Sequence, residues 1–581
     1  MKRKNIFYHI IGAVCVATCL SSCSDFLDID AQDKITLDKF WNEKSDVDGI
    51  VAGCYSGMQS GDMVRRMMIW GEFRSDNIGS GSNLDKDVSL ENILKENLTA
   101  SNSYTTWNNF YNIINRCNTV IKYAPQVAVK DPSFTESEMK ATIAEVSAIR
   151  DLCYFYLIRT FRDVPYSTEA FTDDDQVMDL PATSFDTILS NLITDLESVQ
   201  NNAVKTYPSA TTIQAMYQTG KITQDAIHAM LCEMYLWKQD YANCIKYADL
   251  VIASKKKQKE ENDSKSTSYN QQTKDIFGGY PLISDAFSSS TSMFGNAYNQ
   301  IFGTGNSTES IFELTYVEDD NMLSNAAVND MYGYGGAMGY TTLSTAITQD
   351  VSSKLYSVFN NQFDSRYYEN CVLANSTSGS AVLNIMKYQY TNAYIDVSGS
   401  TPVKSTSGFY SKDKNKSNWI IYRLSDVMLM KAEAEAELMS NSDKLSEQDQ
   451  KYLNDAFSLV TAVNKRSLCE TTLKDTLDPT KFVTKSSMQN LVMQERHREL
   501  MFEGKRWYDL VRRARRDGNT SYLTTQVLSK FTTNVSVIQS KLTKMDAIYW
   551  PYNVDELKVN TNLTQNPAFG SGESGNYEKT N

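Results

Sequence analysis

The stretch TQDAIHAMLCEMYLWKQDYANCIKYADLVIASK, which begins at Thr223, constrains the fold more strongly than any other part of the chain. Ala226, Met230, Met234 and Trp237 recur at three- to four-residue spacings, which predicts a helix with one buried face. A polar break at 238–240 precedes a second helical pattern, so the stretch predicts a helical hairpin of the tetratricopeptide type, about 34 residues long. Such a hairpin cannot bury its apolar face alone and therefore requires neighbours of the same kind.

Similar patterns along the chain predict these neighbours. A second hairpin is expected at 424–466, with its turn enlarged by MSNSDKLSEQDQ. The predicted helices are 104–123, 138–161, 184–199, 223–237, 241–253, 424–439, 450–466 and 488–513. The fold class expected is all-α, an irregular tetratricopeptide-like scaffold of helical hairpins with a loop-rich face.

Polar segments separate the helical regions. Residues 254–274 and 398–418 are Ser-rich and charged or polar, which predicts surface loops. Residues 277–345 are rich in Gly, Ser, Asn and Tyr and predict a loop region that carries aromatic rings. No Pro/Gly linker divides the chain into autonomous halves, so residues 23–581 are expected to form one domain. Its expected parts are 23–253, a loop-rich insertion at 254–310, and 311–581.

The first residues predict export. A cationic start at 2–4 and an apolar stretch at 6–20, too short to span a bilayer, are typical of a signal peptide over residues 1–22. The sequence LSSC then resembles a bacterial lipobox, in which Cys23 would be acylated and become the mature N-terminus. Acyl chains hold a protein at a membrane because each buried methylene contributes about 0.8 kcal/mol. An ordinary signal peptide with an incidental cysteine is the alternative.

The charge excludes one class of partner. The formal net charge is −13, and loss of residues 1–22 removes three cations and no acids, which moves it to −16. A surface with this much negative charge repels the phosphate backbone of a nucleic acid. No nucleic-acid partner is therefore expected. The arginines at 512, 513, 515 and 516 are expected to pair with nearby acids such as Asp509 on a solvated helix face.

Seven cysteines remain after Cys15, Cys19 and Cys23 are set aside, and no CxxC motif occurs. Cysteines 117, 153, 232 and 244 lie in apolar helical patterns, which favours buried thiols over disulfides or a zinc site.

Motifs in the C-terminal third resemble those of the SusD/RagB family. They are RLSDVMLMKAEAE from Arg423, VNKR from Val463, ERHRELMFEGKRWYDLVR from Glu495, and Trp550-Pro551 with QNP from Gln565. The N-terminal part agrees through CSDFLD, Gly71-Glu72 with Asp76-Asn77, and DVPY from Asp163. Ala31, Arg162 and the PYN sequence from Pro551 depart from the family pattern at turns, so they leave local loop shape in doubt.

This resemblance implies about four tetratricopeptide-like helix pairs beneath an irregular ligand-binding face. It also implies a surface-exposed outer-membrane lipoprotein, without enzymatic activity, that captures oligosaccharides for a partner TonB-dependent SusC-like transporter. Peptide capture, as in some RagB-like members, and a scaffold that docks only protein are the alternatives.

The charged run from Glu495 has a structural explanation of its own. On one helix Glu495 and Arg498, Glu499 and Arg506, Glu503 and Arg506, and Asp509 and Arg512 fall on or near common faces, so ion pairs are expected. We therefore favour a buried structural network over a catalytic role, because a buried charge without a partner is costly.

Catalytic and metal motifs are scarce. Only His228 and His497 follow the signal peptide, without HExxH spacing or a GxSxG motif, so neither a histidine-rich metal site nor a Ser-His-Asp triad is expected. The glycines at 333–339 do not form a phosphate-binding motif and predict a flexible loop. A glycosidase would need two carboxylates held about 5 to 10 Å apart, and no pair stands out among 70 acids.

No cofactor is expected. Calcium in the acidic loop at 172–176 is an alternative to a solvated turn.

Sugar binding requires aromatic platforms and polar side chains in loops on a rigid scaffold. The predicted ligand-binding residues are Arg74, Asp76, Asn77, Tyr298, Tyr332 and Tyr334. For each, a turn or ordinary packing is the competing interpretation. Trp107, Trp237 and Trp507 lie within predicted helices and are expected in the core.

Overall fold

The computed structural model describes most of the chain between residues 40 and 570. The described residues are 40–173, 175–265, 277–316, 324–335, 337–348, 358–359, 361, 363–374, 382–400, 402–412, 414–442, 444–470 and 477–570. Cys23 and the expected signal peptide lie outside these ranges. None of the helices in the described ranges is long and apolar enough to cross a membrane.

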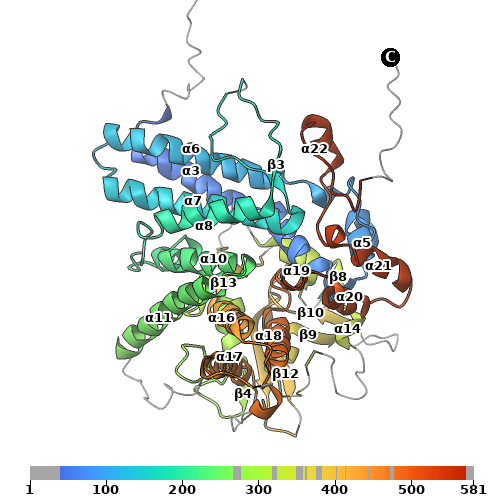
Figure 1. The fold of residues 1–581 in the computed structure, drawn as a ribbon. Coiled ribbons are helices and arrows are strands. Elements are labelled where there is room, and N and C mark those ends of the chain that lie inside the picture. Colours follow the sequence, from blue (N-terminus) through green and yellow to red (C-terminus); the bar gives the residue numbers. More distant parts are fainter. Residues whose placement is uncertain are drawn as a thin grey trace, which may run out of the picture.

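Among the residues described, four pairs of packed helices form the scaffold, as the predicted all-α, tetratricopeptide-like class requires. Figure 1 shows the pairs following one another through the molecule. They are α3 (Lys44–Gln59) with α6 (Asn108–Lys130), α7 (Glu136–Phe161) with α8 (Phe185–Val199), α10 (Gln224–Trp237) with α11 (Tyr241–Lys265), and α16 (Leu424–Leu438) with α17 (Glu447–Arg466).

The hairpin predicted from Thr223 is confirmed as α10 and α11. The Thr223 side chain accepts a hydrogen bond from the backbone N–H of Ala226 at 3.2 Å and caps α10. Gln239 reverses the chain in the predicted polar break with a φ of 62°. Ala229 of α10 and Ala248 of α11 are both fully buried, and the two helices pack against each other.

Several predicted boundaries are wrong. Helix α11 continues to Lys265, across residues expected to be loop, and residues 403–409 form a strand rather than a surface loop. The expected single helix at 488–513 is two helices, α18 (Lys485–Leu500) and α19 (Arg506–Asp517). Phe502 and Gly504, with φ values of 67° and 69°, turn the chain between them.

Shorter helical elements connect and cover these pairs. They are α4 (Gly61–Met68), the π-helical turn η1 (Ile69–Phe73), η2 (Leu84–Lys86), α5 (Val88–Leu94), η3 (Ser103–Thr105), α9 (Thr212–Gly220), α12 (Asn296–Tyr298), η5 (Asn299–Thr304), α13 (Ala326–Tyr332), α14 (Thr345–Thr348), α15 (Ser365–Asn370), η6 (Pro479–Lys481), α20 (Ser521–Leu528), α21 (Val535–Leu542), η7 (Met545–Ile548) and α22 (Val554–Val559).

Small antiparallel sheets account for the strands. They are β1 (Ile78–Ser80) with β8 (Thr341–Leu343), β2 (Val164–Pro165) with β3 (Ala182–Thr183), β5 (Ser310–Leu314) with β13 (Trp419–Arg423), β6 (Gly333–Tyr334) with β7 (Ala337–Met338), β9 (Cys371–Ala374) with β10 (Val382–Ile385), and β11 (Tyr390–Asp396) between β4 (Met293–Phe294) and β12 (Val403–Phe409). The glycine-rich segment that was expected to be a flexible loop thus contains the β6–β7 hairpin.

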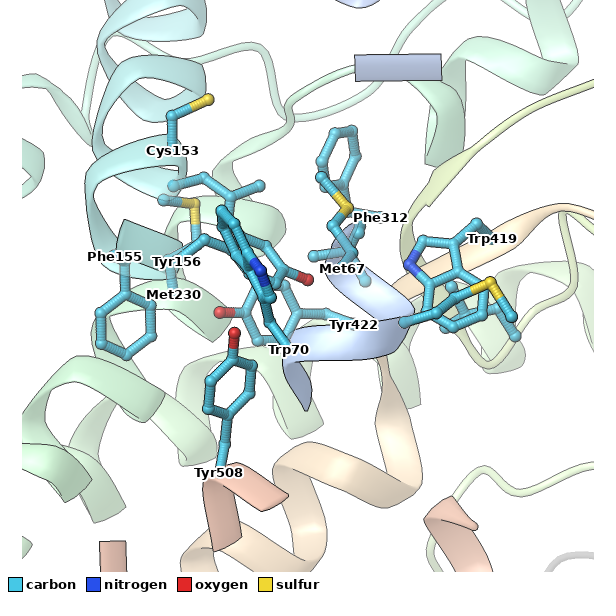
Figure 2. Packing of buried hydrophobic residues seen from close by; sticks show 14 of the residues in the cluster. Met67, Trp70, Cys153, Phe155, Tyr156, Met230, Phe312, Trp419, Tyr422 and Tyr508 are labelled. Atoms are coloured by element: carbon cyan, nitrogen blue, oxygen red, sulfur yellow. The ribbon is translucent and has the colours of Figure 1, made fainter. Parts of the chain in front are cut away.

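One large core joins residues that are far apart in the sequence, from Trp41 to Leu563. Figure 2 shows Trp70 of η1 among Tyr156, Tyr422 and Tyr508, which come from α7, β13 and α19. The predicted burial of Trp107, Trp237 and Trp507 is confirmed. All four cysteines that were expected as buried thiols are buried and free.

Gly71 allows η1 to approach the turn between α18 and α19. A Cβ at this position would lie 1.8 Å from the Gly504 carbonyl oxygen, so any side chain must push two backbones apart. We expect Gly71→Ala to lower the free energy of unfolding by about 3 kcal/mol. Equilibrium denaturation in urea measures the change.

Gly49→Ala is the matched control, because Gly49 is exposed in α3 and an added Cβ would meet no atom within 4 Å. This change should stabilise the protein by about 0.5–1 kcal/mol through helix propensity. Equal effects of the two substitutions would contradict the close approach at Gly71.

Candidate functional site

Two of the segments predicted to bind a ligand, 74–77 and 332–334, meet at the β1–β8 ladder, whereas Tyr298 lies in α12 and packs against Phe302 and Tyr390. Asp76 and Asn77 lie directly before β1. Tyr332 ends α13 and Tyr334 lies in β6, and the β6–β7 hairpin then leads the chain into β8. Ile78 faces Leu343 in the ladder, and the backbone N–H of Ser344 donates to the Asn77 carbonyl at 2.9 Å. Residues more than 250 positions apart therefore lie side by side.

Five of the six predicted ligand-binding side chains nevertheless lie below the surface, so the expectation that they are exposed is wrong. Their exposed fractions are 2% for Arg74, 4% for Asp76, 0% for Asn77, 1% for Tyr298 and 0% for Tyr332. Only Tyr334 of this set is exposed, at 36%. The buried residues are held inward by specific partners from distant parts of the chain.

Asp76 is the partner of Arg506 at the start of α19. The two carboxylate oxygens accept from Nε and Nη2 of Arg506, both at 2.8 Å, in a bidentate pair. Burial alone would raise the pKa of Asp76, but the Arg506 guanidinium lowers it well below the ordinary value. The pairs expected between Arg506 and Glu499 or Glu503 are wrong, because the break between α18 and α19 turns Arg506 toward β1.

Arg74 connects the N-terminal part to the C-terminal part. Its guanidinium pairs with Glu96 at 2.8 Å and donates to the Ala547 carbonyl at 2.9 Å. The same group lies 4.3 Å from the centre of the Trp507 ring. These contacts occupy the donors that would be needed to bind a ligand.

Asn77 belongs to a buried polar cluster with Glu72 and His497. Its side-chain N–H donates to Glu72 at 2.6 Å, and its oxygen contacts Nε2 of His497. Glu72 also accepts from the backbone N–H groups of Phe502 and Lys505, at 3.1 and 3.2 Å. Burial raises the pKa of Glu72 to about 7, against the lowering effect of these donors.

The two buried tyrosines fill the core beneath the surface. The Tyr332 hydroxyl donates to the Phe502 carbonyl at 3.1 Å, and its ring packs edge-on against Phe502. The Tyr298 hydroxyl donates to the Met386 carbonyl at 3.3 Å. Both rings support the loops rather than face solvent.

A small exposed surface remains above this floor, and we call it the tyrosine face. Its members are Ser80, Ser82, Asn83, Tyr334, Met338 and Tyr340, all at least partly exposed. The Gly81 backbone N–H donates to the Tyr340 carbonyl at 3.0 Å, and the Asn83 amide donates to the Met338 carbonyl at 3.4 Å. Ring surfaces, an amide and hydroxyls are therefore presented by the end of β1, the residues that follow it and the β6–β7 hairpin. The sequence analysis missed Tyr340 and Asn83, although both follow glycine-containing turns.

The network expected from the charged run is present, with rearranged partners. Glu499 binds Arg366, Arg423 and Arg466, while Glu503 binds Arg423 and Lys387. The expected pairs of Glu495 with Arg498 and of Asp509 with Arg512 are confirmed, at 2.7 and 2.8 Å. Arg512 is buried, contrary to the expected solvated face, because it also pairs with Glu433.

The two histidines in the described part of the chain both have lowered pKa values. Burial lowers the pKa of His228 to about 4, and burial together with the nearby Arg506 lowers that of His497 to about 3. Neither can therefore be a charged acid near neutral pH. Within the described ranges, no group of three or more His, Cys, Asp or Glu side chains is placed to hold a metal ion.

The loop at 172–176, where calcium was the alternative, is closed by Gln176. Its side-chain oxygen accepts from the backbone N–H groups of Thr172 and Asp173, at 2.6 and 3.0 Å. Residue 174 lies outside the described residues, so calcium binding here stays a prediction.

Stacked helical hairpins beneath an irregular, tyrosine-bearing face define the class, a tetratricopeptide-like scaffold protein. The model of the SusD family matches residues 249–569, and a model described as "Starch-binding associating with outer membrane" matches residues 25–236. The chain belongs to the SusD family.

Known proteins extend this likeness over about nine-tenths of the chain. SusD-like protein P38 of Formosa agariphila is 24% identical over 532 residues, which cover 88% of this chain and 92% of the relative. A solved SusD superfamily protein from Bacteroides vulgatus has a TM-score of 0.62 at 18% identity, covering 91% of this chain and all of its own. A structure described as "Laminarin binding SusD-like protein" has a TM-score of 0.58 at 18% identity, with coverage of 91% and 100%. These structures share the fold.

Asp76→Asn should destabilise the protein by about 3–5 kcal/mol, because it leaves the buried Arg506 without a charged partner. Asp62→Asn is the control: Asp62 is more than half exposed, and its buried partner Arg66 keeps its hydrogen bonds to Thr106, so the loss of the charge should cost less than about 1 kcal/mol. Urea denaturation of both variants measures the difference. If Asp76→Asn were as stable as the parent, the structural role of the pair would be refuted.

Glu72 predicts a pH dependence. Its pKa is about 7 in the folded state and 4.5 as the ordinary value, so the folded protein keeps a proton that the unfolded chain loses over this interval. Stability contributed by this group therefore falls as pH rises from 4.5 to 7 and then levels off. Relative to Glu72→Gln, which does not titrate, the parent should lose about 3 kcal/mol between pH 4 and pH 8.

Urea denaturation of the parent and of Glu72→Gln at each pH provides the measurement. A constant offset between the two proteins is expected from the altered hydrogen bonds and does not bear on the result. A difference that stays the same across the pH range would show that folding does not shift the pKa of Glu72.

Proposed function

We propose that the protein captures an oligosaccharide on the tyrosine face and delivers it to a partner TonB-dependent SusC-like transporter in the outer membrane. The observation that carries the proposal is the exposed ring of Tyr334 in the β6–β7 hairpin of a SusD-family scaffold, with a partly exposed Tyr340 directly before β8. Sugar rings bind to such surfaces because their C–H faces pack on aromatic rings while their hydroxyls bond to neighbouring polar groups.

The position of Tyr334 favours a binding role over a packing role. Gly333, with a φ of 106°, starts the hairpin, and a Cβ there would lie 2.0 Å from the Ala337 carbonyl oxygen. The hairpin is therefore held tightly against its own return strand. Because the backbone that carries Tyr334 is already fixed, it loses little conformational freedom when a ligand binds.

The floor beneath the face supports this interpretation. Asp76 and Arg506 neutralise each other, and Glu72 is enclosed by N–H donors. A floor of paired and hydrogen-bonded groups is rigid and exerts little net attraction on ions, which suits an uncharged ligand.

The family descriptions point the same way. One matching family is described as starch-binding and associated with the outer membrane, and one structural neighbour is described as binding laminarin. We extend these descriptions to this chain as binding of a neutral glycan at the outer membrane. Acylation of Cys23, which lies outside the described residues, would provide the tether.

We propose action by binding rather than catalysis. The conspicuous acids of the ERHRELMFEGKRW run each pair with arginine or lysine, which keeps Glu499 and Glu503 ionised and buried. Such carboxylates serve neither as proton donors nor as exposed nucleophiles.

Tyr334→Ala should reduce affinity for the bound oligosaccharide about five- to tenfold, because one ring–sugar contact contributes about 1–1.5 kcal/mol. Affinity electrophoresis and calorimetry against a panel of neutral polysaccharides, including laminarin and starch, measure the change.

Tyr217→Ala is the matched control, since Tyr217 is similarly exposed, at 38%, but lies on α9. Its removal should leave affinity unchanged. Binding of peptides but of no glycan in the panel would refute the proposed ligand class. Full glycan affinity in Tyr334→Ala would refute the proposed site.

A further inference from the structure

A cavity of about 660 Å³ lies apart from the tyrosine face, between the start of α6, the segment that joins β2 to β3, and α22. This volume falls within the usual range for small-molecule sites. None of the six residues of the tyrosine face lines it.

Asparagines follow one another along the wall that α6 contributes. Asn108, Asn112, Asn115 and Asn118 are spaced by four, three and three residues, so they share one face of the helix. Asn115 holds the loop at Phe171 through two hydrogen bonds of 2.8 Å, one donated and one accepted. Asn118 donates to the Glu169 carbonyl at 2.9 Å. The inner two amides therefore build the cavity.

The outer two amides face solvent. Asn108 and Asn112 are exposed, and neither donates a side-chain hydrogen bond to another residue within the described ranges. Each amide offers two N–H donors and one acceptor oxygen, which match the adjacent hydroxyls of a sugar ring. Two such amides, one helical turn apart, form a polar wall whose donors and acceptors are available to hydroxyl groups of a ligand.

Aromatic rings form the base. Tyr111 is half-buried, and its hydroxyl donates to the Pro165 carbonyl at 2.6 Å, which fixes the ring. Trp107 and Tyr154 pack edge-on against it, with centroid distances of 5.7 and 6.1 Å. Phe171, also half-buried, lines the opposite loop. Ring faces of this kind accept the C–H side of a sugar.

The charges of the lining exclude anions. Among the described residues that line the cavity there is no lysine or arginine, and its acids are Asp179 and Glu556. Burial raises the pKa of Glu556, against a hydrogen bond from Trp107. A phosphorylated, sulfated or uronic ligand would meet only acids and neutral groups.

We propose that this cavity is a second glycan site, which binds one end or branch of a neutral oligosaccharide between the amides of α6 and the Tyr111 ring. The inference rests on the proposed glycan binding and adds a site that is independent of the tyrosine face. Met178 and Val559, both exposed at the rim, would cover the outer apolar side of the sugar.

The test uses the purified mature protein with a panel of neutral hexasaccharides of glucose, mannose, xylose and galactose. Calorimetry gives affinity and stoichiometry, and hydrogen–deuterium exchange shows which segments the sugar protects. We expect two sites per protein for the best hexasaccharide and protection of the start of α6, of residues 165–180 and of α22. The double substitution Asn108→Ala/Asn112→Ala should weaken the second site at least about tenfold.

Asn109→Ala is the matched control, because Asn109 lies on the same turn but donates to Asp62 at 2.9 Å, away from the cavity. It should change neither site more than about twofold. All three asparagines are at least partly exposed, so the variants should fold.

The outcomes separate the two proposals. Unchanged affinity and stoichiometry in the double variant, with loss in Tyr334→Ala, would overturn the second site and leave the proposed function. Loss only in the double variant would support the cavity and overturn the tyrosine face. Absence of binding to every hexasaccharide, or binding of cationic peptides in the cavity instead, would overturn the inference.

Discussion

The buried ion network around the break between α18 and α19 is the constraint on which the rest of the structure depends. Glu499 and Glu503 share Arg423, which stands where β13 meets α16. Burial opposes their ionisation, but the surrounding cations lower the pKa of both carboxyls. Because each of these charges has a partner of opposite sign, the helical scaffold can bury them. Loss of one partner would leave a buried charge unpaired, which would destabilise the fold. The network thereby fixes how α18, α19 and the strands meet.

The same break directs Arg506 to Asp76 and so attaches the β1–β8 ladder to the scaffold. Gly71 and Gly504 allow this approach because neither carries a side chain. The tyrosine face thus rests on groups whose hydrogen bonds are already made. Asp76 and Asn77, which the sequence suggested as ligand-binding residues, instead support the exposed residues from below. This division favours a rigid receptor that binds through rings and amides, with its charges enclosed.

Local patterns predicted the scaffold because tetratricopeptide-like hairpins are local. The Thr223 cap and buried Ala229 lie within one hairpin, so their spacing was sufficient. The site was harder, because burial of Asp76 depends on Arg506, 430 positions later, and no periodicity reveals that pair. Gly504 is a signal for the break between α18 and α19. The apolar and charged pattern continues on both sides of it, and for that reason the sequence predicted a single helix. Serine-rich composition likewise misled at residues 403–409, where backbone pairing with β11 decides the structure.

A structure of the mature protein with its bound oligosaccharide tests the central claim most directly. The account predicts a sugar ring against the exposed face of Tyr334, with the Asp76–Arg506 pair closed beneath it and unchanged from the free protein. A sugar bonded directly to Asp76 or Arg506, with the ion pair opened, would contradict a receptor whose charges serve only to hold its binding face.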